Sequence, residues 1–172
     1  MVNFPGSGRI HLKKVGRLHG KVIVNFKEDA EYRKRLALGF LKEARLNFKY
    51  ELWRSCVDNS QLAIENSGKL VIALFEPVEK THNPSHQLKR ILDKKRVDQA
   101  FKSKGDELIS LLDLFGIEEH FMTDYGDETT RTDPWSLFDK QDAEEALATA
   151  ERCYSLAEEI YTTYCKETPT TQ

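Results

Sequence analysis

Small and apolar residues recur every three or four positions in the last third of the chain, and this spacing restricts the fold more than any other feature. An α-helix places residues three and four apart on one face, so this segment predicts an amphipathic helix that must bury its stripe. Asp139 is expected to cap it. The small alanines favour a place at the centre of a bundle or at a subunit interface. The stripe consists of Ala143, Ala146, Leu147, Ala150, Cys153, Tyr154, Ala157, Ile160, Tyr161 and Tyr164.

Four earlier segments have the same helical period. Asn83 followed by Pro84 is typical of an N-cap and a first helical residue, and Pro77 and Gly116 are typical of helix ends. We therefore expect an all-α fold, an antiparallel up-down bundle of four to five helices over residues 28–165. An arm or β-hairpin over 1–27 should precede it, and a disordered tail over 166–172 should follow. The earlier helices are expected at about 28–48, 51–75, 84–92 and 97–115.

Length and composition agree with one globular domain. The chain has 172 residues, of which 40% are hydrophobic and 31% charged. It has no apolar run of the roughly 18 to 20 residues needed to span a bilayer, so we expect a cytoplasmic protein without a membrane partner. The three cysteines have no C-x-x-C spacing, which argues against a disulfide framework and a structural zinc site. We expect neither a metal nor a cofactor.

The charges are strongly polarised along the chain. Residues 1–105 contain 22 Lys and Arg against 11 Asp and Glu, whereas residues 106–172 contain 4 against 17, giving net charges of +11 and −13. One interpretation is that basic and acidic helices lie side by side, or meet across a dimer, and neutralise each other. The other is that the basic half binds phosphate or nucleic acid. The residues expected to form such a basic surface are Lys13, Lys14, Arg17, Arg33, Lys34 and Arg35.

The common self-sufficient catalytic motifs are absent from the sequence. His82 and His86 are four residues apart, as in some metal sites, but a helix start lies between them and no acidic ligand adjoins them. Gln61, Glu65 and Lys69 form a polar line on the second predicted helix. Its simplest interpretation is a surface ion pair between Glu65 and Lys69.

The middle of the chain nevertheless resembles a known family, the HEPN domain (higher eukaryotes and prokaryotes nucleotide-binding). The resemblance covers residues 30–165. It is carried by the line Gln61, Glu65 and Lys69, by the segment with His86 and Leu88, by a later acidic stretch with a tyrosine and an Arg before a proline, and by the final helix. The later stretch contains Asp124, Tyr125, Glu128, Arg131 and Pro134.

The chain departs from this family at one point that matters for activity. HEPN ribonuclease toxins have an Arg followed, after four to six residues, by a His, so that Arg holds phosphate and His transfers a proton. No Arg of this chain has that spacing to a His. The departure disfavours RNA cleavage and favours binding.

The remaining candidates for a ligand site are His86, Asp124, Tyr125, Glu128 and Arg131, which we expect to meet at one end of the bundle. Arg suits bidentate phosphate contact, and Tyr can stack on a base. The alternative is that Arg131 pairs with Asp127 or Glu128 and that His86 caps its own helix.

The resemblance implies a non-catalytic HEPN-like protein, prokaryotic and from a toxin-antitoxin or defence context, that binds a nucleotide or RNA. It also implies a homodimer or a nucleotidyltransferase partner. Two alternatives remain. One is a metal-independent endoribonuclease in which His86 and Arg131 are catalytic, and the other is a structural adaptor whose alanine stripe binds another helix.

Overall fold

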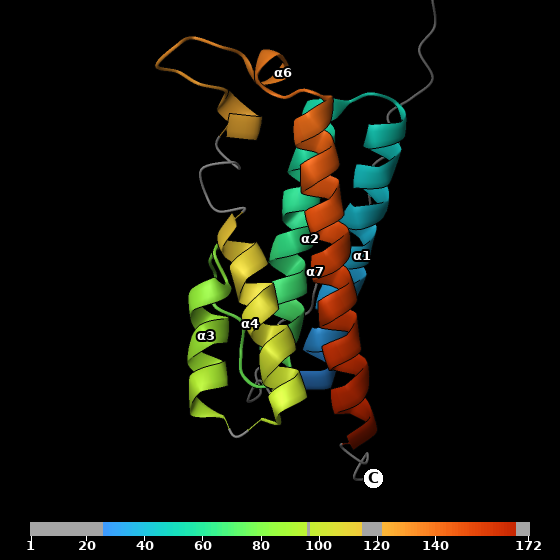
Figure 1. The fold of residues 1–172 in the computed structure, drawn as a ribbon, viewed down its shortest axis with the longest axis vertical. Helices are drawn as coiled ribbons and strands as arrows, with labels where there is room; N and C mark the ends of the chain where they lie inside the picture. The colour runs from blue at the N-terminus through green and yellow to red at the C-terminus, as the bar shows by residue number, and fades with distance from the viewer. Residues whose placement is uncertain (1–25, 96, 115–121, 168–172) are drawn as a thin grey trace, which may run out of the picture.

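Five helices of ten or more residues form in the part of the chain that the structure describes, residues 26–95, 97–114 and 122–167 of a computed structural model. This part is an all-α bundle, as expected from the periodicity (Figure 1). The predicted N-terminal arm and most of the predicted tail lie outside the described residues. The helices are α1 (Phe26–Lys49), α2 (Trp53–Ala73), α3 (Ser85–Lys94), α4 (Gln99–Leu114), the short α6 (Pro134–Leu137) and α7 (Lys140–Glu167).

Side-chain hydrogen bonds mark where three of these helices begin. Asn83 Oδ1 accepts from the Ser85 backbone N–H at 3.1 Å, but the N-cap position of α3 is Pro84, one residue later than predicted. Asp98 Oδ1 accepts from the Phe101 N–H at 2.8 Å at the start of α4. Asp139 caps α7, as predicted, and the Asp142 carboxylate accepts from its N–H at 2.8 Å. These reciprocal bonds form a capping box.

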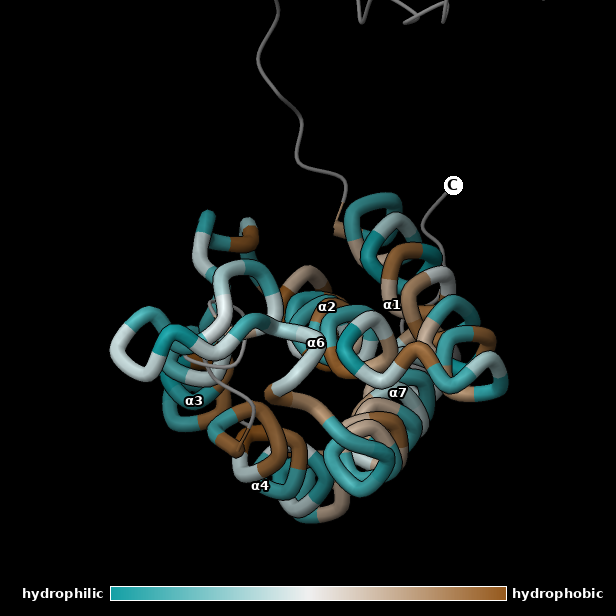
Figure 2. The backbone as a smooth tube through the Cα atoms, turned by 90° about the horizontal axis from the view of Figure 1, so that it is seen from above, coloured by the Kyte–Doolittle hydropathy of each residue, from teal (hydrophilic) through white to brown (hydrophobic). Residues whose placement is uncertain are grey.

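The central helix is α2, and not α7 as the alanine stripe suggested. Fourteen of the 21 residues of α2 are buried. Seen from above, α2 lies between α1 and α7 on one side and α3 and α4 on the other (Figure 2). Leu70 and Ile72 are fully buried, and burying such a side chain contributes about 1.5–3 kcal/mol.

The alanine stripe of α7 is used inside the chain. Ala143, Ala146, Ala150 and Ala157 are each 0% exposed, packed in the hydrophobic clusters that α7 shares with α1 and α2. A second helix cannot dock on a stripe that is already covered. The adaptor hypothesis in the form that relied on this stripe is therefore wrong.

The chain directions depart from a simple up-down order. In Figure 1, α1 rises, α2 descends, and α3 descends again beside α2 before α4 rises and α7 descends. The residues that join α2 to α3 run back along the bundle, and an extended chain of eleven residues can span about 36 Å. This return places Pro84, just before α3, against Gly68 in the lower half of α2.

The opposite charges of the two halves of the chain meet within the bundle. Lys34 and Arg45 of α1 pair with Glu158 and Glu151 of α7, each at 2.8 Å. Lys104 of α4 pairs with Glu159 of α7 at 2.8 Å. The interpretation that basic and acidic helices lie side by side is confirmed for α1 and α7.

No helix among residues 26–95, 97–114 and 122–167 is long and apolar enough to cross a membrane.

Two helical glycines should respond in opposite ways to alanine. A Cβ at Gly39 would meet nothing within 4 Å, so Gly39→Ala should raise the free energy of unfolding by about 0.5–1 kcal/mol through helix propensity. A Cβ at Gly68 would lie 2.8 Å from Leu112 and 3.0 Å from the Pro84 ring. Gly68→Ala should therefore lower the free energy of unfolding by about 1–2 kcal/mol. Urea unfolding of both variants measures the difference, and equal effects would contradict this packing.

Candidate functional site

One face of α2 carries a continuous polar stripe. Residues spaced by three or four positions share a helix face, and from the top of α2 downward the stripe consists of Arg54, Asp58, Gln61, Glu65 and Lys69. Its upper end contacts the segment 122–125, and its lower end contacts the connection between α2 and α3. The stripe thus links two regions that are far apart in sequence.

The lower end of the stripe is buried, which corrects the expectation of a surface ion pair. The Lys69 side chain is 8% exposed and that of Glu65 13%. Lys69 Nζ donates to Glu65 Oε1. Because an isolated buried charge costs several kcal/mol, removing either partner of this pair should destabilise the fold.

Glu65 also holds a histidine. His82 Nδ1 lies 3.0 Å from Glu65 Oε2, while the His82 side chain is 61% exposed. A carboxylate at Nδ1 favours the tautomer with the proton on Nδ1 and fixes the orientation of the ring. The close approach of Pro84 to Gly68 brings this loop onto α2. His82, and not His86, is therefore the histidine that the fold orients. Sequence reasoning missed this role because His82 and Glu65 are 17 residues apart in the chain, and local spacing does not show that they meet.

The loop above α2 is shaped by its own hydrogen bonds. Asp127 and Thr132 exchange two backbone hydrogen bonds, at 2.9 and 3.0 Å, which close a hairpin-like turn. Gly126 begins the turn with φ +75°, and a Cβ there would lie 2.3 Å from the Thr132 carbonyl oxygen. Asp133 caps α6 by accepting from the Trp135 and Ser136 N–H groups. The loop therefore has a definite shape.

Two aspartates of this loop have lowered pKa values because they accept hydrogen bonds as carboxylates. The side-chain bond from Thr130 is the largest cause of the lowered pKa of Asp127, and that from Ser136 the largest cause of the lowered pKa of Asp133. Both carboxylates therefore accept hydrogen bonds from residues of the loop itself and stabilise its shape.

The loop presents an arginine and two aromatic side chains to solvent. Tyr125 is 67% exposed and Trp135 is 74% exposed. They adjoin Gly126 and Pro134, which pack against each other. Arg131, with φ +58°, lies at the turn and is exposed. Phe138 packs against the cluster that includes Cys56 and Val57, whereas Trp135 faces solvent.

Arg131 does not pair with either of the two acidic residues that the sequence analysis considered as its partners. Among the residues that the structure describes, Arg131 forms no ion pair with Asp127 or Glu128. The Asp127 carboxylate instead accepts from Thr129 and Thr130. Glu128 is exposed in the same turn. Within the described chain, Arg131 is thus available to an external anion.

His86 does not join this loop, so the five predicted residues do not meet at one place in the described chain. Pro84 contacts Gly68, whereas Arg54 Nε donates to the Thr123 carbonyl oxygen at 2.6 Å. Fourteen residues of α2 separate Arg54 from Gly68, which is about 21 Å along the helix. His86 is exposed in the first turn of α3, where the Ser85 backbone N–H donates to Asn83 and not to His86.

Asp124, the fifth predicted residue, has a structural contact. Its Oδ1 accepts from Arg54 Nη2 at 3.2 Å, and Arg54 also lies 3.9 Å from Asp58. Asp124 thus joins the loop to α2. The structure brings Asp124, Tyr125, Glu128 and Arg131 together in one loop segment and leaves His86 out.

The expected basic surface on α1 is not one surface. Consecutive helical residues point about 100° apart. Arg33 Nη1 donates to Asn66 of α2 at 3.3 Å, Lys34 pairs with Glu158 of α7, and Arg35 is exposed. Lys13, Lys14 and Arg17 lie outside the described residues. The three α1 cations therefore face α2, α7 and solvent.

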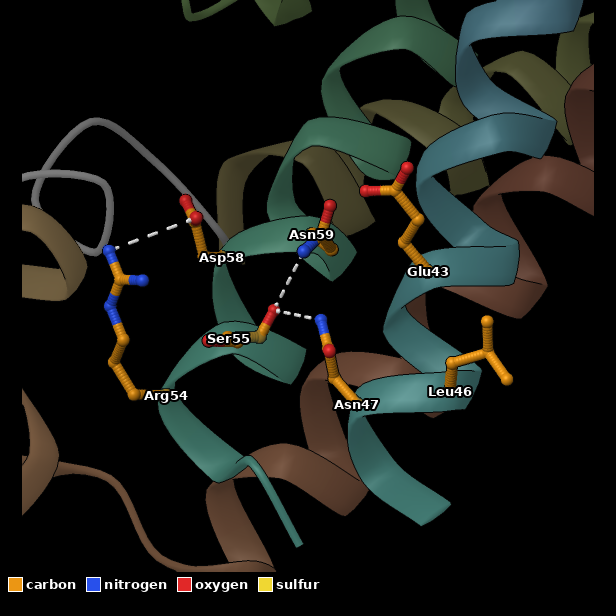
Figure 3. A pocket seen from close by; sticks show the side chains of 7 residues that line it. All are labelled: Glu43, Leu46, Asn47, Arg54, Ser55, Asp58 and Asn59. Carbon is orange, nitrogen blue, oxygen red and sulfur yellow. Dashed lines mark hydrogen bonds and ion pairs between the residues drawn. The ribbon is translucent and has the colours of Figure 1, made fainter. Parts of the chain in front are cut away.

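A hollow between α1 and α2 adjoins the upper end of the stripe (Figure 3). The amides of Asn47 and Asn59 both donate to the Ser55 carbonyl oxygen, at 3.1 and 3.0 Å. Figure 3 shows Arg54 pointing away from these amides toward Asp58. These contacts hold the α1–α2 corner together.

Comparison with known proteins gives one match. The sequence model described as the HEPN domain matches residues 30–160. No curated protein and no solved structure matches the chain.

The loop should loosen in acid. The ordinary pKa is 3.8 for Asp127 and Asp133, and both are lowered in the fold. The order that these carboxylates provide is therefore complete above about pH 4 and is lost as the pH falls below 3.8 through the folded pKa values. Trp135 fluorescence titrated from neutral pH downward should report the change. Asp133→Asn should weaken the change, whereas an unaltered titration in that variant would contradict the assignment.

Proposed function

Since the chain belongs to the HEPN domain family, we propose that it is a non-catalytic module that binds a nucleotide or single-stranded RNA on the loop of residues 122–137. Membership of this family indicates a function related to nucleotides or RNA. The loop is where the described part of the chain offers the chemistry for such a ligand. A homodimer and a nucleotidyltransferase partner, in a toxin-antitoxin or defence setting, belong to the same proposal.

The observation that carries this proposal is the pair of exposed aromatics beside an arginine with no ion-pair partner in the described chain. Tyr125 and Trp135 adjoin the contact between Gly126 and Pro134, and Arg131 lies in the intervening turn. Base stacking on an aromatic ring contributes about 1–3 kcal/mol per base and tolerates any base. A guanidinium suits a phosphate because it donates two parallel hydrogen bonds.

The separation of His86 from Arg131 supports binding over cleavage. An acid–base residue must reach the reacting atoms to within hydrogen-bonding distance. The start of α3 lies against Gly68 and the loop lies against Arg54, and these two residues are about 21 Å apart along α2. His86 and Arg131 of one chain therefore do not act on the same phosphate. The endoribonuclease hypothesis in that form has no support within one chain.

Binding should be visible in the protein's own fluorescence. Trp135 is 74% exposed, so a stacked base should quench its emission. Titration with mononucleotides and with oligouridylate should show saturable quenching that Trp135→Phe abolishes. Tyr125→Ala or Arg131→Gln should weaken the affinity about tenfold.

Tyr50→Ala is the matched control for this titration. Tyr50 is 66% exposed at the end of α1, where its backbone N–H donates to Leu46 and Asn47 of the same helix. Its removal should leave the affinity unchanged. Equal losses in Tyr50→Ala and Tyr125→Ala, or no quenching by any nucleotide, would reject the loop as the binding site.

One observation favours a second candidate, a metal-independent endoribonuclease that uses His82. The Glu65 carboxylate lies 3.0 Å from His82 Nδ1 and the His82 side chain is 61% exposed, which is an arrangement that supports proton transfer. His86 has no comparable partner among the described residues. If the chain cleaves RNA, His82 is the residue expected to accept the 2′-hydroxyl proton.

A cleavage assay with a chelator present separates the two histidines. His82→Ala should lower the cleavage rate at least about 100-fold, whereas His86→Ala, an exposed histidine four residues away, should not. An RNA pool left intact by the unaltered protein would eliminate this candidate. Equal loss of cleavage in both variants would contradict the assignment of His82, rather than His86, as the proton acceptor.

A further inference from the structure

Among the described residues, the acidic half of the chain neutralises cations on α1 and α4 but none on α3. The acids of α7 pair with Lys34, Arg45 and Lys104. Helix α3 packs against α2 and α4 and makes no contact with α7. The cations on and beside α3 are therefore out of reach of the most acidic element of the described chain.

The outer face of α3 is correspondingly basic. Its apolar residues Leu88, Ile91 and Leu92 are 0–4% exposed and face the bundle. The opposite face carries polar side chains alone. We define the α3 face as the exposed residues of α3 together with the flanking Lys80 and Lys95: Lys80, His86, Lys89, Arg90, Asp93, Lys94 and Lys95.

Four cations of this face have no ion-pair partner among the described residues. Arg90 is neutralised, because it pairs with Glu76 at 3.1 Å and with Glu79 at 2.7 Å. The four others are Lys80, Lys89, Lys94 and Lys95. The backbone N–H of Glu79 donates to Gln87 at 3.0 Å, which places Lys80 beside the first turns of α3. Three of the lysines thus lie on or at the end of α3 and the fourth lies alongside it.

We propose that the α3 face binds the phosphate backbone of an RNA strand, which extends the proposed function from a ligand on the loop to a polyanion across the bundle. The inference rests on the proposed function only in taking RNA as the class of ligand. Lysines attract phosphate mainly as point charges and need no fixed geometry, so several of them along two turns of helix suit a chain of phosphates.

The chemistry of the α3 face favours RNA over other anionic partners. A protein interface has an apolar centre with aromatic or aliphatic anchors, and α3 exposes none. A helix that lies on an anionic membrane inserts apolar side chains, and those of α3 are buried. What remains exposed is charge, the feature that sequence-independent binding to a phosphate backbone uses.

The position of His82 and His86 supports the same ligand. His86 lies on the α3 face, and the exposed His82 lies in the connection that also contains Lys80. A strand bound along α3 therefore passes near the imidazole that Glu65 orients.

The test compares two full-length variants with the same change in charge. One carries Lys→Gln at Lys80, Lys89, Lys94 and Lys95. The other neutralises four exposed cations of α1, with Gln at Lys27, Arg35, Lys42 and Lys49. Glutamine preserves helix propensity, and circular dichroism melting of both variants checks that the fold is retained. The probe is fluorescently labelled oligouridylate, and its affinity is measured at several salt concentrations.

The α3 variant should lose affinity about tenfold or more at low salt. For a single strand, the slope of log affinity against log salt should become shallower by about 0.7 for each phosphate contact removed. The α1 variant should retain both the affinity and the slope. Equal losses in the two variants, an unchanged α3 variant, or an unaltered protein that does not bind the probe would overturn the proposal.

Two further arms separate this inference from its alternatives. Loss of binding to phosphatidylserine vesicles in the α3 variant, with RNA affinity intact, would overturn it in favour of a membrane. Quenching of Trp135 by a mononucleotide tests the loop independently. Quenching with an unaltered salt slope in the α3 variant would retain the loop and reject the α3 face, whereas a reduced slope without quenching would reject the loop alone.

Discussion

Helix α2 is buried around most of its circumference and nevertheless carries charged side chains along one face, and the surrounding loops are placed by the need to satisfy those charges. An unpaired ion in a protein interior costs several kcal/mol, so Glu65 and Lys69 are stable there only as a pair. The second oxygen of Glu65 then holds His82, and Arg54 at the other end holds Thr123 and Asp124. Two connections that follow different helices are thereby fixed to one helix.

Small residues make these contacts reachable. Gly68 lets Pro84 and Leu112 approach α2, and Gly105 does the same for Leu92. Without the close approach at Gly68, the connection that carries His82 would stand farther from Glu65. The Gly126 turn has a similar role at the top of the bundle, because its positive φ and missing side chain allow the chain to fold back on Thr132. Packing at glycine therefore sets the geometry of both candidate regions.

The periodicity of the sequence was sufficient to predict the five long helices and most of their core residues, because three-four spacing of apolar residues is a local property. Caps such as Asp139 were also predictable, since a cap acts on its own first turn. The direction of α3 was not predictable, because residues 74–84 contain no pattern that indicates whether the connection turns at the end of α2 or runs back along it. The exposure of Trp135 could not be predicted for a related reason: an isolated aromatic in a connection has no pattern that shows which way it faces.

By itself, the sequence determined the helical class, the polar line of Gln61, Glu65 and Lys69, the polarity of charge and the departure from Arg-to-His spacing, all of which depend on residue identity and short separations. Only the tertiary structure decided that the polar line is buried, that His82 rather than His86 is oriented, and that α3 retains lysines without ion-pair partners in the described chain. Burial and pairing depend on which helices become neighbours. That choice is made by the packing of the whole bundle, where Glu65 meets a residue 17 positions away and Arg54 meets one 70 positions away.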